Sequence, residues 1–143
     1  MIVPPALAWK CVRKNTCFMV KRNGVELTSE PGNVMNKNSF KYSGIANAKT
    51  VDIQLDGDDV VMGLKAPKCV SKPTKMMKKT PLKKDFRRVS HSIKTQVGGQ
   101  WYRPDLTDMA LARYSALYSA QMTKKGLKKT AKVKPAKSAI KAE

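Results

Sequence analysis

Two short runs near the start of the chain mix apolar and polar residues in the manner of β-strands. Residues 17–22 and residues 25–30 flank the dipeptide Asn23-Gly24, which favours the positive φ angles that a tight hairpin turn requires at both central positions. Pro31-Gly32 then interrupts the second run. The pattern predicts a first β-hairpin.

A second pair of runs alternates more cleanly. In residues 49–55 every second residue from Val51 onward is apolar and would face a core. Residues 56–58, Asp-Gly-Asp, predict a turn, and residues 59–64 predict the returning strand. The apolar segment 6–14 predicts a short helix that packs against the same core. Two hairpins with a helix beside them make a small α+β body.

Helical periodicity appears in residues 85–123. Gly98-Gly99 is expected to end a first amphipathic helix. A second helix is expected to begin at Pro104, because a proline at the first helical position loses no hydrogen bond. The apolar positions that define the first helix are Phe86, Val89, Ile93 and Val97.

Charge divides the chain unevenly. Its 143 residues carry 29 Lys+Arg and 10 Asp+Glu, a formal charge of +19. Residues 1–63 hold 8 basic and 6 acidic residues, whereas residues 64–143 hold 21 basic and 4 acidic residues. A compact protein with such a surplus of positive charge repels itself unless a polyanion neutralises it. RNA or DNA can act as that polyanion, because binding releases condensed counterions. An anionic membrane surface is the competing partner, but no amphipathic anchor or lipid site accompanies the lysines.

Composition also suggests domain boundaries. Residues 65–84 contain eight lysines, three prolines, no acid and no aromatic residue, too little apolar surface to offset the entropy of ordering. Residues 124–143 contain eight lysines and read as a disordered basic tail. The expected fold class is therefore α+β. A globular body spans residues 1–64, a basic extended linker 65–84, two amphipathic helices 85–123 and the lysine-rich tail 124–143.

The residue types that catalysis requires do not gather in this sequence. His91 is the only histidine, and its neighbouring serines would point in different directions on a helix, so they make no triad. Cys11, Cys17 and Cys69 are odd in number and form no Cys-x-x-Cys pair, which argues against a disulfide framework or a zinc site. We expect no enzymatic activity, no cofactor and no metal. No run of 18 apolar residues exists, so no bilayer-spanning segment is expected.

The basic residues favour contacts with phosphate over the reading of base edges. Lysine outnumbers arginine 23 to 6, which suits point-charge contacts better than bidentate recognition of guanine. Basic residues also stand beside aromatic ones in residues 37–42 and 100–104, where a ring can stack on an unpaired base. The alternative is that Phe40, Tyr42 and Trp101 pack in the core or at a hinge.

Six short motifs occur in a fixed order along the chain. They are Trp9 with Val12-Arg13-Lys14-Asn15, Phe18 with Val20-Lys21-Arg22-Asn23, Thr28-Ser29-Glu30-Pro31 with Asn33, Asn38-Ser39-Phe40-Lys41-Tyr42-Ser43-Gly44, Lys49-Thr50-Val51, and Tyr102-Arg103-Pro104-Asp105-Leu106. In this order and spacing they resemble the eukaryote-specific family of large-subunit ribosomal proteins numbered twenty-eight. The resemblance covers residues 9–64 well and 86–122 moderately, whereas the linker and the tail match no pattern of the family.

The resemblance implies a structural constituent of the large (60S) subunit of the cytosolic eukaryotic ribosome, which would pass through the nucleolus during assembly. Its partners would be rRNA and neighbouring ribosomal proteins, with no membrane and no small-molecule substrate. Carried over residue by residue, it points to Lys21, Arg22, Asn38, Ser39, Lys41 and Arg103 as RNA-binding positions. The positive charge of the chain suggests further RNA-binding positions, which are Lys37, Lys68, Lys72, Lys75, Lys78, Lys79, Arg87, Arg88, Arg113, Lys124, Lys125, Lys128 and Lys129.

Two other functions remain open from the sequence. Residues 128–137 resemble a linker-histone tail, which would suit a chromatin protein, although no winged helical body accompanies them. A ribosome-assembly factor is the second alternative. The N-terminal module of one pre-ribosomal assembly factor is a relative of the family that this chain resembles. That module carries additional cysteines, which this chain lacks.

Overall fold

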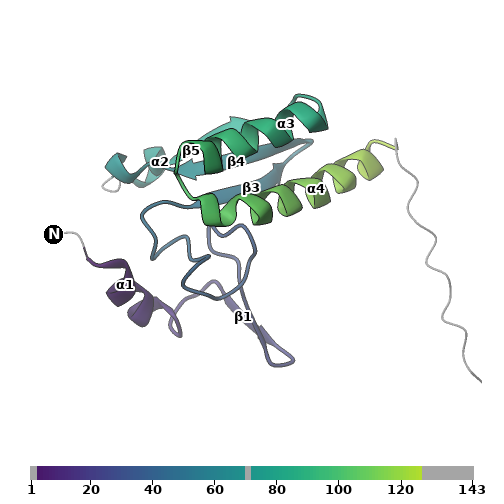
Figure 1. Ribbon diagram of the computed structural model, residues 1–143. Coiled ribbons are helices and arrows are strands. Elements are labelled where there is room, and N and C mark those ends of the chain that lie inside the picture. Colours follow the sequence, from purple (N-terminus) through teal and green to yellow (C-terminus); the bar gives the residue numbers. More distant parts are fainter. Residues whose placement is uncertain (1–2, 70–71, 127–143) are drawn as a thin grey trace, which may run out of the picture.

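The computed structural model describes residues 3–69 and 72–126 of the chain (Figure 1). It is a mixed α+β structure with two separate small sheets, as the sequence predicts. Residues 127–143, most of the predicted tail, lie outside the described residues. The elements are α1 (Pro5–Val12), β1 (Met19–Arg22), β2 (Val25–Thr28), β3 (Val51–Asp56), β4 (Asp59–Lys65), the 3-10 helix η1 (Pro67–Cys69), α2 (Pro73–Met76), β5 (Met77–Pro81), α3 (Phe86–Ile93), the π-helix η2 (Lys94–Gly99), the 3-10 helix η3 (Pro104–Leu106) and α4 (Thr107–Lys124).

Both predicted hairpins are confirmed. Strands β1 and β2 pair antiparallel from Met19 opposite Thr28 to Arg22 opposite Val25. The turn between them places Asn23 at φ 49° and Gly24 at φ 75°, the left-handed conformations expected of this dipeptide. Strands β3 and β4 also pair antiparallel and turn through a glycine with positive φ. The β1–β2 hairpin forms a sheet of its own, which projects away from the rest of the molecule (Figure 1).

The second sheet is larger than the sequence suggests, because a third strand, β5, pairs antiparallel with β4. This strand lies inside the segment 65–84 that composition presents as an extended linker, and η1 and α2 lie there too. The amino-acid composition of this segment does not predict the strand, because the strand lies at the edge of the sheet. There its backbone pairs on one side only, and Lys78 and Lys79 remain exposed. Lysine is common on such edges.

The helices and the three-stranded sheet share one core. Helices α3 and α4 lie on the same face of the sheet, and α4 runs across β3 and β4 (Figure 1). The buried side chains from the sheet meet those from η2, η3 and both helices in a single cluster. Residues 85–123 are therefore packed on the sheet as well as on each other. The cluster consists of Val34, Val51, Ile53, Val60, Met62, Val89, Ile93, Val97, Leu106, Ala110 and Tyr114.

An aromatic group joins α3 to α4. The Phe86 ring stacks on Tyr114, with centroids 5.3 Å apart, and lies 5.2 Å from Tyr118. Burial raises the pKa of Tyr114 to about 12, so its hydroxyl stays neutral. The helix boundaries follow the sequence: η2 ends at Gly99, and helical structure resumes at Pro104.

Helix α1 differs from its expected role. None of its residues is buried, so it does not contribute to the core. Its Trp9 ring lies 6.2 Å from the ring of Phe40, in the segment that follows the first hairpin. Residues 38–44 of that segment form turns and bends.

The shared core predicts one cooperative unfolding transition. Replacing Ile93, which is fully buried, with alanine should lower the free energy of unfolding by about 2–5 kcal/mol, because the cavity cannot close completely. The exposed Arg87→Ala variant of the same helix should change it by no more than about 0.5 kcal/mol. Urea unfolding followed by both circular dichroism and fluorescence measures these values. Two separate transitions would show that the helices and the sheet are independent units.

Candidate nucleic-acid interface

A long irregular segment, residues 29–50, connects the hairpin to the three-stranded sheet and is held by buried polar groups. Glu30 is only 4% exposed. Its carboxylate accepts hydrogen bonds from the backbone N–H of Gly44 (3.2 Å), the amide of Asn33 (3.2 Å) and the hydroxyl of Ser43 (3.3 Å). These three contacts, from Asn33 and from the adjacent residues Ser43 and Gly44, fold the segment onto one charged group, which fixes a loop that has no regular secondary structure.

Lys65 holds the same loop from the sheet side. The residue is 7% exposed, and its ammonium donates to the carbonyl oxygens of Gly44 and Asn47, both at 2.9 Å. Burial lowers the pKa of Lys65, and the negative charge of Glu30 acts in the opposite direction. A buried ammonium is tolerated only when its donors are used. Lys65 is therefore part of the scaffold and does not face solvent.

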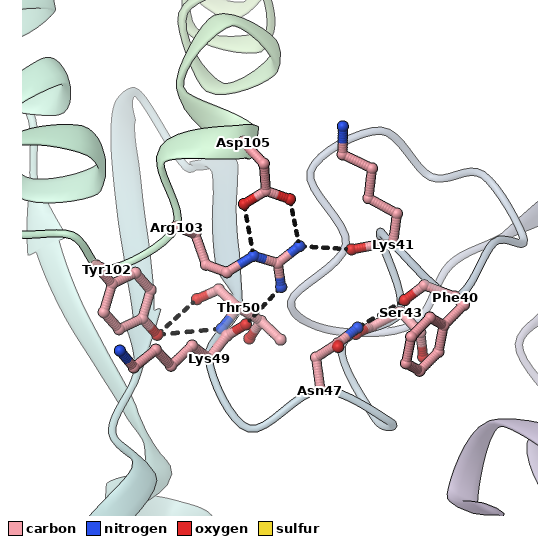
Figure 2. A network of polar contacts seen from close by, with 9 residues as sticks. All are labelled: Phe40, Lys41, Ser43, Asn47, Lys49, Thr50, Tyr102, Arg103 and Asp105. Atoms are coloured by element: carbon pink, nitrogen blue, oxygen red, sulfur yellow. Dashed lines mark hydrogen bonds and ion pairs between the residues drawn. The ribbon is translucent and has the colours of Figure 1, made fainter. Parts of the chain in front are cut away.

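Tyr102 attaches the turn before α4 to the start of β3. Its hydroxyl accepts from the N–H of Thr50 at 3.1 Å and lies 3.1 Å from the carbonyl oxygen of the same residue (Figure 2). The carbonyl oxygen of Lys65 lies 2.5 Å away, and the hydroxyl donates to one of these two carbonyls. Burial raises the pKa of Tyr102, so the hydroxyl keeps its proton. Residues more than fifty positions apart in sequence are thereby joined.

Arg103 completes the attachment. Its guanidinium forms a paired contact with the carboxylate of Asp105, at 2.8 and 2.9 Å, and donates to the carbonyl oxygens of Lys49 (3.0 Å) and Lys41 (2.8 Å) (Figure 2). The side chain of Arg103 is only 17% exposed. These hydrogen bonds from Arg103 lower the pKa of Asp105 and keep it ionised. Arg103 therefore holds the loop against the beginning of α4.

The attached loop and turn surround a shallow hollow of about 450 Å³. We call it the loop–turn surface, and it is lined by Phe40, Lys41, Asn47, Ala48, Lys49, Arg103 and Asp105. Because Arg103 binds the backbone carbonyls of both lysines, their side chains are left to point outward, and Figure 2 shows the ammonium of Lys41 directed away from the network.

Cations and an exposed ring meet at the loop–turn surface. The ammonium of Lys41 lies 5.8 Å from the Tyr42 ring centroid, and that of Lys49 lies 5.7 Å from the Tyr102 ring centroid. Within residues 3–69 and 72–126, neither ammonium has a carboxylate within 4.0 Å. Phe40 is 41% exposed and lines the hollow. Two exposed ammonium groups and an accessible ring, all from residues that line one hollow, can contact phosphates and a base of the same strand.

The structure brings only part of the predicted RNA-binding set to this surface. Lys41 lies on it with a free ammonium, whereas the donors of Arg103 are mostly taken by internal hydrogen bonds. Asn38 donates to the carbonyl of Arg13 (3.1 Å) and to the carboxylate of Glu26 (3.0 Å), so its amide is a loop contact. Its hydrogen bond is the first cause of the lowered pKa of Glu26, followed by Lys21.

The other predicted residues are spread over several elements. Lys21 and Arg22 are exposed on β1, where Lys21 lies 3.4 Å from Glu26. Arg113 is partly buried and donates to the carbonyl of Ile53 at 3.3 Å. Ser39 is partly buried, and Lys128 and Lys129 lie outside the described residues. The remaining positions are exposed: Lys37, Lys68, Lys72, Lys75, Lys78, Lys79, Arg87, Arg88, Lys124 and Lys125.

Sequence reasoning missed Lys49 as a member of the surface, and it missed the groups that support it. Lys49 belongs to the Lys49-Thr50-Val51 motif, but its place at the start of an alternating strand gives no sign of contact with RNA. Glu30, Lys65 and Tyr102 act through contacts with distant parts of the chain, which no local pattern reveals.

Other kinds of site were also sought in the described part of the chain. Among residues 3–69 and 72–126, no group of three or more His, Cys, Asp or Glu side chains is arranged to hold a metal ion. No helix in those same ranges has the length and apolar character needed to cross a membrane.

Comparison with known proteins gives a consistent result. The model of the ribosomal L28e protein family matches residues 7–120, which include the whole loop–turn surface. The chain is 37% identical over 131 residues to large ribosomal subunit protein eL28 of Schizosaccharomyces pombe, covering 87% of this chain and 98% of that protein. It is 35% identical over 115 residues to the protein of the same name from Dictyostelium discoideum (80% and 86% covered) and 32% identical over 107 residues to that of Trypanosoma cruzi (75% and 70% covered).

The contact between Asp105 and Arg103 predicts a pH-dependent contribution to stability. Because the pKa of Asp105 is lowered from 3.8, this contribution is fully present above pH 3.8 and is lost as the pH falls through the lower folded-state pKa. Asp105→Asn should lower the free energy of unfolding at neutral pH by roughly 0.5–1 kcal/mol, since water partly screens the pair. Below pH 3.8 the difference from the wild type should shrink.

Urea titrations over a pH series test this expectation. The exposed Asp108→Asn variant, on the first turn of α4, is the matched control for the loss of one negative charge. A difference for Asp105→Asn that stays constant from neutral to acidic pH would contradict the assigned ion pair.

Proposed function

The chain belongs to the ribosomal L28e protein family and is thus a structural protein of the large ribosomal subunit, and we propose that it binds rRNA there through phosphate contacts of its lysines. The family assignment also identifies the chain as a non-enzymatic protein of the eukaryotic translation machinery, located on the ribosome. Its expected partners on that particle are rRNA and other ribosomal proteins. Passage through the nucleolus during assembly is part of the proposal.

The observation that carries the phosphate proposal is the loop–turn surface. Lys41 and Lys49 expose ammonium groups that no described carboxylate neutralises, and the loop under them is fixed by Glu30, Lys65 and Arg103. Because the loop is already folded, binding does not have to order it. The cost of binding is then limited to the lysine side chains.

A second group of lysines supports the same role. Lys78 and Lys79 are exposed on β5, the edge strand of the three-stranded sheet, and Lys72 and Lys75 are exposed just before and on α2. Lysines on a strand edge can follow a phosphate backbone without any sequence readout. Together with the formal charge of +19, they favour a polyanion that contacts the molecule at more than one place.

Sedimentation of cell extract tests the assignment against the two alternatives. We expect the tagged full-length chain to sediment with the large subunit, with whole ribosomes and with polysomes, and to remain there at moderately high salt. A chain found with pre-ribosomal particles alone would be an assembly factor. A chain found with chromatin alone would support the linker-histone likeness of residues 128–137 and would refute the proposal.

The phosphate contacts predict a change in salt dependence. Replacing both Lys41 and Lys49 with glutamine should reduce the steepness of log affinity against log salt by roughly 1.4–1.8, since each phosphate contact contributes about 0.7–0.9. Equilibrium binding of the full chain to purified large-subunit rRNA, repeated over a salt series, measures this slope.

Lys83→Gln provides the matched control. The ammonium of Lys83 lies 3.3 Å from the carboxylate of Asp59, so it already has a partner within the chain. Its removal should leave the slope nearly unchanged. An unaltered slope for the double variant would refute the phosphate role of Lys41 and Lys49.

A further inference from the structure

Trp101 combines two unfavourable features that the fold itself does not require. Its side chain is 81% exposed, so the indole does not pack in the core or at a hinge. Its backbone adopts φ +50°, in the left-handed region that disfavours bulky side chains. The other non-glycine residues with positive φ in the described ranges are Asn23 and Asn36, and asparagine tolerates this conformation well. A strained and exposed tryptophan points to a role outside the isolated chain.

The position of Trp101 is rigid on both sides. Its own N–H donates to the carbonyl of Gly98 at 3.0 Å, at the end of η2. The next two residues are Tyr102 and Arg103. The Tyr102 hydroxyl is hydrogen-bonded to Thr50 and to the carbonyl of Lys65 at the end of β4, and Arg103 is bonded to the loop. Figure 2 shows the contacts with Thr50 and with the loop. The indole is therefore displayed from a fixed base, and little backbone entropy is lost when a partner covers it.

Basic side chains are present in the segments on both sides of Trp101. The ammonium of Lys49 lies over the ring of the adjacent Tyr102, and Lys94 is exposed at the start of η2, the helix that precedes Trp101. The nearest acid along the chain, Asp105, is neutralised by Arg103. The preceding residues, Gly99 and Gln100, are exposed and offer no apolar rim of the kind that surrounds a tryptophan at a protein–protein contact.

We propose that Trp101 stacks on an unpaired nucleobase of large-subunit rRNA, while Lys49 holds a phosphate of the same strand. Every base presents a π-face, so an exposed indole accepts any of them without a specific edge contact. The cationic neighbours favour the negatively charged backbone that accompanies such a base. This inference rests on the proposed function and adds to it a residue that recognises single-stranded RNA.

Tryptophan emission provides a direct test in the full-length chain. The sequence contains two tryptophans, so a Trp9→Phe variant leaves Trp101 as the only indole and keeps an aromatic ring against Phe40. Single-stranded oligoadenylate should quench the emission of this variant. A blunt adenine–uracil duplex of equal length should quench it much less, because its bases are already paired. Equal or absent quenching by the two probes would overturn the proposal.

Substitution of Trp101 separates stacking from a structural role. Trp101→Gly suits the left-handed backbone, so the fold should be retained with an unchanged or higher melting temperature. Its affinity for single-stranded oligoadenylate should fall by roughly 5- to 150-fold, whereas Trp101→Phe should keep most of the affinity. The slope against salt should stay that of the wild type, because an uncharged ring releases no counterions.

The outcomes also distinguish this inference from the proposed function. A wild-type chain that binds neither probe in a salt-dependent manner would refute both. A steep wild-type slope with unchanged affinity of Trp101→Gly would refute stacking alone. A Trp101→Gly chain that binds RNA normally but fails to sediment with the large subunit would show that the indole contacts a protein, which also overturns the stacking proposal.

Discussion

The geometry of the whole loop from residue 29 to residue 50 depends on the burial of the Lys65 ammonium. A loop without helix or strand leaves its backbone carbonyls without regular partners, and burying them unpaired is costly. Lys65 reaches from the end of β4 and satisfies two of them, at Gly44 and Asn47. Glu30 satisfies an N–H of the same loop and lowers the cost of the buried positive charge. This pair of charges, together with Arg103, fixes the backbone from which Phe40, Lys41 and Lys49 project.

Arginine and lysine divide their roles around the loop–turn surface. The planar guanidinium of Arg103 donates hydrogen bonds to Asp105 and to two backbone carbonyls, and Arg113 likewise binds the backbone of β3. Lys41 and Lys49 contribute backbone carbonyls to this network and keep their ammonium groups outside it. Directional groups build the support, and point charges remain for a partner whose phosphates vary in position.

Local patterns predicted the local elements and missed the tertiary ones. Asn23-Gly24, Gly98-Gly99 and Pro104 marked their turns and boundaries correctly, because the conformational preferences of these residues act within a few positions. Strand β5 was missed because its pairing depends on the free edge of β4 and not on its own composition. The shared core was missed for the same reason: no periodicity states which face of a helix meets which sheet.

At the candidate site, too, local sequence motifs identified residues but not their tertiary contacts. Lys41, expected from its motif to bind RNA, lines the loop–turn surface, whereas Asn38 and Arg103, taken from the same set of motifs, mainly support the loop. A sequence motif contains both the residues that support the loop and the residues that are exposed on it, and the motif does not distinguish between them. Only the hydrogen-bond partners of each side chain separate the two groups.

Strand β5 has a consequence for the chain before it reaches a partner. Its outer side carries unpaired backbone groups, and such an edge can recruit the same edge of another copy and start aggregation. Lys78 and Lys79 stand on this edge, so two copies that approach edge to edge would bring four ammonium groups together and repel each other. The lysines that we propose for RNA thus also keep newly made, unassembled copies apart, and the repulsion disappears once a polyanion neutralises them.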